Sequence, residues 1–341
     1  MKKKLLLIFA LIFNYICAYT SSNTYDFFAN TKKISGEKVD IGCLIGTPSE
    51  LVLIDSLLLF YDRYERQTIT VFDTKNNRFI RRFLYEGNGP EEIIPPLKLF
   101  VSYRNKQINI FQIQTGSLYV YDAKDIAVTE KEPAIYQKLS FGDRPANIKQ
   151  TRDGFVGIGM FNNGRFHLYD QEGKFVNPAG QYPFRGEEMN PDVRFFVYQG
   201  VFCSSPNGNS YAIGSSYCDN LEFYHIENNN ASLVKKYETY DVNAKFEQKL
   251  IINEECIMNY KAAYGCDKYC YMLYSGKPYL ENGKRSYSGK KIIVFDWKGE
   301  YVKSFEADKE IFAFCVDENE GVIYAFTYDE EEGNIITRFK I

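Results

Sequence analysis

Histidine and tryptophan are scarce in this chain. Its 341 residues include two histidines, His167 and His225, and a single tryptophan. Zinc sites are built from cysteine and histidine side chains at characteristic short spacings. No such spacing occurs among the eight cysteines, which are Cys17, Cys43, Cys203, Cys218, Cys256, Cys266, Cys270 and Cys315. The sequence therefore predicts no metal site, and we expect no cofactor.

The motifs of common enzyme classes are also missing. We find no serine nucleophile elbow, no cysteine–histidine pairing and no dinucleotide-binding fingerprint. The adjacent Glu91 and Glu92 would point to opposite sides of an extended chain, so both cannot act on one glycosidic bond. We expect a protein that is not an enzyme. A metal-dependent hydrolase or lyase of the sugar-lactone type is the alternative.

The N-terminus has an apolar run that is too short to cross a bilayer, which needs about 20 apolar residues. Three lysines precede this run, Leu5 to Phe13, and a short polar-to-small segment follows it. This order is typical of a secretory signal, with Ile16 and Ala18 at the minus-three and minus-one positions. We predict a signal peptide over residues 1–18, a single domain over 19–341, and export to the periplasm or cell envelope.

Cys17 offers a second interpretation of this segment, as the lipid-bearing first residue of a membrane-tethered protein. Against it, Ile16 stands where a lipobox has glycine, alanine or serine. Removal of residues 1–18 takes away three lysines and no acid, so the formal charge changes from -3 to -6. Nucleic-acid binding relies on neutralising phosphates with lysine and arginine, so we expect no nucleic-acid partner.

Seven cysteines remain after the signal peptide, so at least one must be unpaired or intermolecular. Cys203 and Cys218 flank a turn and could face each other across a hairpin. Cys266 and Cys270 would share a face if one unbroken strand contained both. We expect most of the seven to be small buried hydrophobic residues.

Aromatic residues are abundant, with 28 tyrosines and 27 phenylalanines, and they favour half-buried β-strands. One strand pattern recurs: an apolar residue, any residue, an apolar residue, an aromatic residue and usually aspartate. The copies are ITVFD ending at Asp73, LYVYD at Asp122, FHLYD at Asp170, LEFYH at His225 and IIVFD at Asp296. Turn-forming segments follow directly, so we predict hairpins with loops of three to five residues, including DAKDIAV after LYVYD.

Another pair of short strands precedes each copy, which gives four-stranded units spaced 48 to 71 residues apart. Such units without large helices predict a β-propeller. The C-terminal segment supplies only three strands, and residues 32–43 could supply a fourth and close a six-bladed ring. In the longest interval, Phe246, Leu250 and Ile257 predict a short helix inserted between blades four and five. The predicted class is all-β, a six-bladed β-propeller.

Glycine, then two residues, then proline recurs where the outer strand of one blade crosses to the inner strand of the next. The three corners are GNGPEEI from Gly87, GDRPANI from Gly142 and GQYPF from Gly180. Glycine permits unusual φ angles and proline cannot extend a ladder, so these residues suit a sharp crossing.

The segment GNGPEEI, one strand pair after LVLIDSLLLFYDRYERQTITVFD, resembles the Gly-x-Gly-Pro-x-Glu segment of the TolB-like six-bladed β-propellers. These are common as exported proteins and lipoproteins of Bacteroides-type bacteria. The resemblance implies a periplasmic or cell-surface propeller, and it implies no particular activity.

Equivalent corners of a propeller converge around the mouth of its central channel, so we expect a binding site there. The ligand would be a peptide, a glycan or a partner protein, and we expect a monomer. A structural role in an envelope complex is a further alternative, and pairing of Arg144 with neighbouring acids is an alternative role for the corners. The candidate residues are Asn88, Glu91, Glu92, Asp143, Arg144, Asn147, Tyr182 and Arg185.

Overall fold

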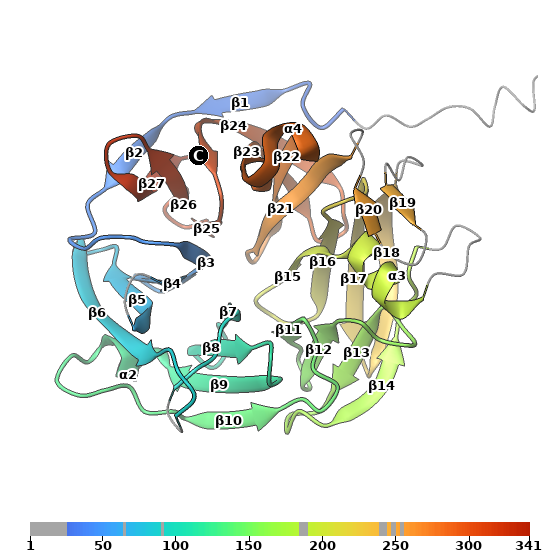
Figure 1. The fold of residues 1–341 in the computed structure, drawn as a ribbon, viewed down its shortest axis with the longest axis horizontal. Helices are drawn as coiled ribbons and strands as arrows, with labels where there is room; N and C mark the ends of the chain where they lie inside the picture. Colours follow the sequence, from blue (N-terminus) through green and yellow to red (C-terminus); the bar gives the residue numbers. More distant parts are fainter. Residues whose placement is uncertain are drawn as a thin grey trace, which may run out of the picture.

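A computed structural model describes residues 26–63, 66–89, 92–183, 190–238, 244–246, 250–252 and 256–341. Six sheets of the described chain are arranged in a ring around a central channel (Figure 1). Each sheet forms one blade, and the innermost strand of each blade lines the channel. The predicted six-bladed β-propeller is therefore confirmed.

The blades follow one another along the sequence, and in the first three the strands run from the inner to the outer edge in chain order. Blade 1 contains β3 (Pro48–Ile54), β4 (Leu57–Asp62), β5 (Gln67–Asp73) and β6 (Arg78–Tyr85). Blade 2 contains β7 (Leu97–Ser102), β8 (Gln107–Gln112), β9 (Ser117–Asp122) and β10 (Gln137–Ser140). Blade 3 contains β11 (Asn147–Gln150), β12 (Phe155–Ile158), β13 (Phe166–Tyr169) and β14 (Phe175–Ala179).

The remaining blades keep this pattern, but the N-terminal segment contributes to two of them. Blade 4 contains β15 (Gly200–Ser204), β16 (Ser210–Ser215), β17 (Asn220–Glu227) and β18 (Asn230–Glu238). Blade 5 contains β21 (Ile257–Gly265), β22 (Tyr269–Pro278), β23 (Gly289–Asp296) and β24 (Tyr301–Ile311), with β1 (Thr31–Ile34) added outside β24. Blade 6 contains β25 (Phe314–Asp317), β26 (Val322–Asp329), β27 (Gly333–Lys340) and β2 (Gly36–Val39).

The recurring strand pattern marks the third strand of blades 1 to 5, namely β5, β9, β13, β17 and β23. Both faces of such a strand are buried, because each blade packs between two neighbours; in one core cluster Leu59 and Ile69 of blade 1 pack with Leu99 and Ile108 of blade 2. The core of this protein thus lies between blades rather than inside any one of them.

Aspartate at the end of the recurring pattern organises the turn that follows. Asp73 Oδ1 accepts a hydrogen bond from the backbone N–H of Lys75 at 3.0 Å, and Asp296 Oδ1 accepts one from Lys298 at 2.9 Å. Such bonds two residues ahead are the predicted turn chemistry. The hairpin prediction is wrong after Asp122, where α2 (Ala123–Ala127) intervenes and β10 begins only at Gln137. In that segment Ile126 is fully buried, so burying this face competes with a tight turn.

The helix predicted between blades four and five is also wrong. The described residues there form a two-stranded hairpin of β19 (Ala244–Phe246) and β20 (Leu250–Ile252), and Ile257 begins β21. Phe246 pairs with Leu250 in this hairpin. A spacing of four residues places side chains on one face of a helix, but it also suits partners across a hairpin with a three-residue loop, so the pattern was ambiguous.

The N-terminal segment crosses the outside of blades 5 and 6. Strand β1 pairs in parallel with β24, and β2 pairs antiparallel with β27 (Figure 1). Between the two strands, Asp308 of β24 accepts hydrogen bonds from the hydroxyl of Ser35 at 2.6 Å and from the backbone N–H of Gly36 at 3.2 Å. One segment thereby joins two neighbouring blades.

Helices are short in the described chain. Helix α3 (Pro191–Tyr198) lies between blades 3 and 4, and α4 (Tyr279–Asn282) with the 3-10 helix η1 (Gly283–Tyr287) is inserted between β22 and β23. No helix within the described residues has the length and apolar character needed to span a membrane.

The cysteine pairings considered from the sequence do not occur. Cys203 lies on β15 whereas Cys218 lies beyond the end of β16, and Cys266 falls between β21 and β22 rather than on one strand with Cys270. No disulfide links the seven cysteines that the structure describes, and all but Cys43 are buried. Cys17 lies outside the described residues.

Candidate functional site: a cup in the central channel

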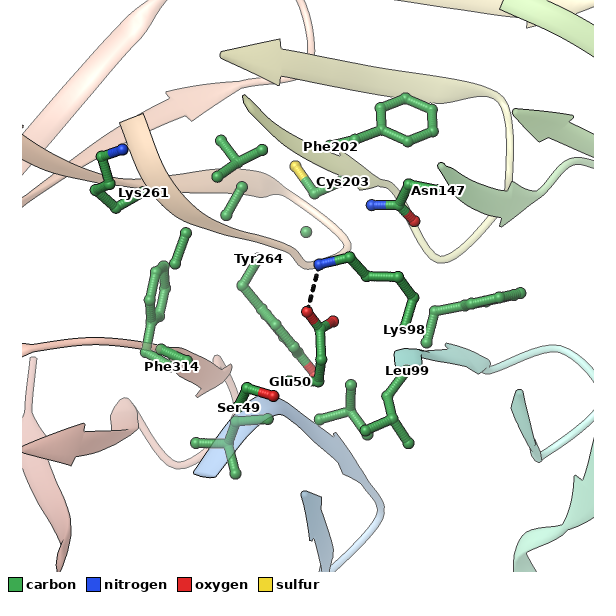
Figure 2. Close-up of a pocket in the computed structure, with 18 of the residues that line it drawn as sticks. Ser49, Glu50, Lys98, Leu99, Asn147, Phe202, Cys203, Lys261, Tyr264 and Phe314 are labelled. Atoms are coloured by element: carbon green, nitrogen blue, oxygen red, sulfur yellow. Dashed lines mark hydrogen bonds and ion pairs between the residues drawn. The ribbon is translucent and has the colours of Figure 1, made fainter. Parts of the chain in front are cut away.

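The inner strands of all six blades enclose a cavity of about 360 Å³ in the central channel. Figure 2 shows side chains from different blades directed toward the same space. The polar and charged members of its lining are Ser49, Glu50, Lys98, Tyr103, Asn147, Lys149, Ser204, Ser216, Lys261, Tyr264 and Tyr287. We call this cavity the cup.

Two tyrosines meet across the channel and form the floor of the cup. Tyr103 follows β7 of blade 2 and Tyr264 lies near the end of β21 of blade 5, and their hydroxyl oxygens are 2.6 Å apart. The hydroxyl of Tyr103 also donates to the carbonyl oxygen of Leu53 at 3.1 Å. Blades 2 and 5 stand opposite each other in the ring, so this contact spans the channel.

The mouth lies at the opposite end, where the blade-to-blade corners enter the inner strands. Asn147 is the first residue of β11 and directly follows a corner, and it lines the cup. The loop between β16 and β17 and the insertion between β22 and β23 reach the same end and contribute Ser216 and Tyr287.

Two of the charged side chains in the cup lie at β-bulges of inner strands. The register of β3 against β4 shifts between Ser49 and Leu51, so Glu50 is an extra residue, with a φ of 50°. The register of β21 against β22 shifts between Tyr260 and Ala262, which leaves Lys261 as an extra residue. Bulges redirect side chains and are frequent beside functional sites. Here they bring an acid and a base to the channel.

Three lysines and one glutamate give the cup a net positive charge when the lysines are protonated. Lys98 Nζ lies 2.5 Å from Glu50 Oε1, so these two charges neutralise each other (Figure 2). Among the residues that the structure describes, no acidic side chain is within ion-pair distance of Lys149 or Lys261. Burial lowers the pKa of Lys149 to about 8 and that of Lys261 to about 7.

Aromatic rings lie within cation–π distance of both lysines. Lys149 Nζ lies 5.3 Å from the ring centroid of Phe100. Lys261 Nζ lies 4.6 Å from the ring of Tyr287 and 5.7 Å from that of Tyr217. A ring face attracts an ammonium group but cannot neutralise its charge. Both lysines therefore keep the capacity to attract an anion.

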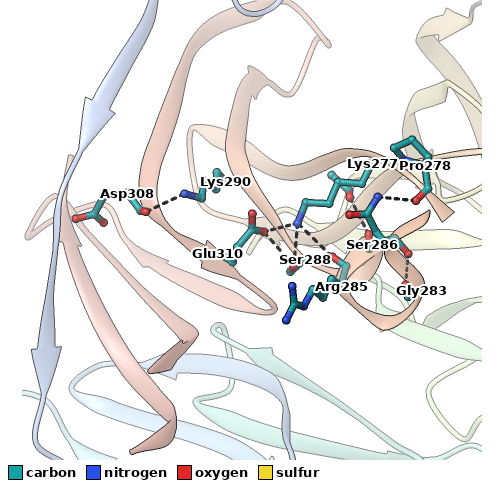
Figure 3. A network of polar contacts seen from close by, with 11 residues as sticks. Lys277, Pro278, Gly283, Arg285, Ser286, Ser288, Lys290, Asp308 and Glu310 are labelled. Carbon is teal, nitrogen blue, oxygen red and sulfur yellow. Dashed lines mark hydrogen bonds and ion pairs between the residues drawn. The ribbon is translucent and has the colours of Figure 1, made fainter. Parts of the chain in front are cut away.

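A polar network fixes the insertion that carries Tyr287 (Figure 3). Lys277 Nζ forms an ion pair with Glu310 at 2.6 Å and donates to the carbonyl oxygen of Arg285 at 3.2 Å. The hydroxyl of Tyr287 lies 3.1 Å from that of Tyr217 on blade 4. Together these contacts hold the two tyrosines beside Lys261.

Of the predicted site residues that the structure describes, only Asn147 lines the cup. Its Oδ1 is buried and finds no hydrogen-bond partner in the described part of the chain. Glu92 folds back on its own corner, accepting from the backbone N–H of Gly89 at 2.8 Å and from Arg66 at 3.2 Å. Asn88 is exposed at that corner. Glu91 and Arg185 lie outside the described residues.

The second corner makes contacts within blade 3. Asp143 binds Nδ1 of His167 and accepts a hydrogen bond from the hydroxyl of Tyr169 at 2.8 Å. The bond from His167 contributes most to lowering the pKa of Asp143, against the opposing effect of burial. Arg144 is exposed and adopts a left-handed φ of 49°. Neither Asp143 nor Arg144 lines the cup.

Tyr182, from the third corner, lies between two guanidinium groups. Its ring centroid is 4.6 Å from Cζ of Arg165 and 4.7 Å from Cζ of Arg194. Its hydroxyl donates to the carbonyl oxygen of Gly159 at 3.3 Å. This arrangement joins the third corner to helix α3 instead of presenting Tyr182 to the channel.

Sequence reasoning missed the lysines, because nothing in their local pattern distinguishes them. Lys98, Lys149 and Lys261 are each flanked by ordinary strand residues, and their convergence depends on the ring. The sequence signal that could have identified them is a lysine on a predicted inner strand, because the other residues of inner strands are largely buried.

Fold and site together define a six-bladed propeller whose central channel is crossed by a tyrosine pair and holds a basic cup. The chain belongs to the TolB-like 6-blade propeller-like family, whose model matches residues 27–319. No curated protein matches the sequence.

Two solved structures share the fold. The chain is 12% identical to a protein of Bacteroides fragilis described as exported, with a TM-score of 0.56, covering 92% of this chain and 97% of that one. It is 13% identical to a member of the DUF4221 family from Bacteroides vulgatus, with a TM-score of 0.54, covering 91% and 97% of the two chains. At this identity the similarity is one of fold.

Proposed function

We propose that this protein is an exported, non-catalytic binding protein that takes the end of a polar ligand into the cup. The ligand class is a peptide, a glycan or a segment of a partner protein. The observation that carries this proposal is the cup itself: six strands, a tyrosine floor, an open mouth, and charged side chains left without acidic partners. Concave sites with a few convergent polar groups are the usual form of a ligand site.

Three observations support export. The N-terminal residues follow the order of a secretory signal, the chain belongs to the TolB-like family, and a fold neighbour is described as exported. A membrane tether through Cys17 and a monomeric state are part of the same proposal.

Binding is favoured over catalysis by the chemistry of the lining. Glu50 is the single carboxylate among the described residues of the cup, and Lys98 neutralises it. Glycoside hydrolysis commonly uses two carboxyl groups. In the described chain, moreover, no group of three or more histidine, cysteine or acidic side chains could hold a metal ion. No structural observation favours the sugar-lactone alternative.

A screen with a blocked cup tests the proposal. The full chain is screened against glycan and peptide libraries. Each hit is measured again with Ser49→Trp, which puts a bulky side chain into the cup. Ser232→Trp makes the same change on the exposed outer strand β18 and serves as the control. We expect hits to be lost with Ser49→Trp and kept with Ser232→Trp. Hits that survive in a folded Ser49→Trp protein would place the ligand elsewhere.

A further inference from the structure

We propose that the cup selects ligands that carry a carboxylate next to a hydrogen-bond donor, with Lys149 and Lys261 attracting the carboxylate and Asn147 accepting from the donor. This inference rests on the proposed function and names the ligand chemistry for that same site. A sugar acid and the C-terminus of a peptide both offer this chemistry.

The charge distribution is the first argument. The chain as a whole carries a formal charge of -3, yet the cup contains three lysines and one glutamate. A cleft lined by one sign of charge between low-dielectric walls focuses the field and concentrates ions of the opposite sign. An acidic protein with a basic cavity is therefore arranged to attract small anions rather than an anionic polymer surface.

The ion pair between Lys98 and Glu50 is the second argument, because it separates the lysines into two kinds. Lys98 already has a carboxylate partner at 2.5 Å. Within the described chain, Lys149 and Lys261 have ring faces rather than carboxylates as partners, at 5.3 Å for Phe100 and 4.6 Å for Tyr287. Burying an ammonium group without a counter-charge is costly, and an incoming carboxylate removes that cost.

The third argument is the unsatisfied oxygen of Asn147. A buried carbonyl oxygen without a donor costs free energy, and most such atoms in folded proteins are paired. Oδ1 of Asn147 has no partner among the residues that the structure describes, although Asn147 lines the cup two residues before Lys149 on the same strand. Residues two apart on a strand face the same side. A hydroxyl or amide N–H beside the carboxylate of a ligand would satisfy this oxygen.

The aromatic walls and the volume of the cup limit the shape and size of the ligand. Phe100, Phe202, Phe312 and Phe314 line the cup, and together with the tyrosine floor they present apolar faces. A volume of about 360 Å³ accommodates a small molecule or the terminal unit of a chain. Such a ligand would place its polar end against the lysines and its apolar face against the rings.

Matched pairs of probes test the inference with the full chain at pH 6 and low salt. D-glucuronate is compared with D-glucose, and an N-acetyl amino acid is compared with its neutral amide, by calorimetric titration. We expect the acid of at least one pair to bind ~10-fold or more tightly than its neutral partner, the size of one charge-assisted hydrogen bond. Preference within the first pair identifies a sugar acid as the source, and preference within the second identifies a peptide terminus.

Lysine variants assign the preference to the cup. Lys149→Gln and Lys261→Gln should each reduce the preference for the acid at least severalfold, while Lys298→Gln, at an exposed turn, should leave it unchanged. Lys149→Arg and Lys261→Arg retain the charge and should retain the preference, which separates loss of charge from loss of folding.

Several results would overturn the inference. These are equal affinity for the two members of both pairs, no binding of either acid at millimolar concentration, or an unchanged preference in both glutamine variants. The library screen could instead yield a neutral ligand whose binding is lost in Ser49→Trp. That result would support the proposed binding function and contradict the requirement for a carboxylate. The two proposals therefore fail separately.

Discussion

Arg165 and Glu222 form an ion pair between blades 3 and 4, with 3.0 Å between guanidinium nitrogen and carboxylate oxygen and only 2% of each side chain exposed. Glu222 also accepts hydrogen bonds from Tyr224 at 2.6 Å and from Asn220 at 3.1 Å. A buried charge that loses its partner is strongly destabilising. This pair thus makes the contact between the two blades dependent on one carboxylate.

The Glu222→Gln variant keeps the shape of the side chain and removes its charge. We expect a loss of about 3 kcal/mol or more in the free energy of unfolding, because Arg165 stays buried without a counter-charge. Urea denaturation measures this. The control is Glu300→Gln, which breaks the surface pair of Glu300 with Lys235 and should change stability by less than about 1 kcal/mol. Similar losses for the two variants would contradict the structural assignment.

Tyr182→Leu should lower stability and spare ligand binding. The ring lies between Arg165 and Arg194, and each cation–π contact contributes about 0.5 to 2 kcal/mol. Thermal unfolding and a binding assay on the same preparation separate the two effects. Arg144→Ala, at an exposed corner residue, is the companion variant. If these changes abolish binding and leave the melting temperature unchanged, the ligand binds at the corners instead of the cup.

Anion binding in the cup should weaken as the pH rises from 6 to 9. Burial lowers the pKa of Lys261 to about 7 and that of Lys149 to about 8, so both are charged at pH 6 and largely neutral at pH 9.

Other titrating groups face these lysines. Cys256, Tyr217 and Tyr287 face Lys261, and burial raises the pKa of all three, which opposes their ionisation over this range. Glu50, Lys98 and Cys203 face Lys149. Titration calorimetry at several pH values measures the trend, and Lys261→Arg should flatten it. Affinity that rises with pH would have the wrong sign.

Oxidation should join Cys203 to Cys270 before any other pair. Their Sγ atoms lie 3.3 Å apart between blades 4 and 5. Glutathione disulfide in a refolding mixture would accept two electrons and two protons from these thiols and leave as two thiols. Alkylation followed by peptide mass spectrometry should then find one linked pair and five alkylated cysteines of the seven that the structure describes. Cys315→Ser should keep the link and Cys203→Ser should lose it; both cysteines alkylated would refute the pairing.

Gly36→Val should destabilise the protein at the junction of blade 6 with the N-terminal segment. A Cβ atom at Gly36 would lie 2.3 Å from Cγ2 of Thr337, so β2 could not keep its place on β27. Gly142→Val is the matched control, because nothing lies within 4 Å of a Cβ atom there. We expect a melting temperature lower by several degrees for the first variant only. Equal melting temperatures would show that β2 contributes little.

The architecture was predictable because it is repeated. Each copy of the strand pattern places a buried third strand before an aspartate turn, as at Asp73 and Asp296, and local chemistry is sufficient to produce it. The exceptions occur where a local pattern fits two structures. Phe246 and Leu250 suit a helix and a hairpin equally, and the actual pairing depends on neighbouring chain.

The site was only partly predictable. Asn147, which the prediction drew from a corner, lines the cup because it is the first residue of an inner strand and so lies beside the channel. The bulges that direct Glu50 and Lys261 inward are register shifts between strands, and a sequence without its pairing partner does not reveal them. The position of Tyr182 depends on two arginine partners that are distant in the sequence, Arg165 just before β13 and Arg194 on α3.

The pairing of β2 with β27 has a consequence for the order of events during synthesis. Gly36 pairs with Phe339, so the ring cannot be sealed until almost the whole described chain has left the ribosome. Closing so long a loop is slow, and until closure the blades synthesised earlier have strand edges that are exposed to solvent. The cup needs all six inner strands, so a nascent chain has no ligand site. A ligand that binds only the sealed ring would therefore stabilise the finished protein selectively and report that its assembly is complete.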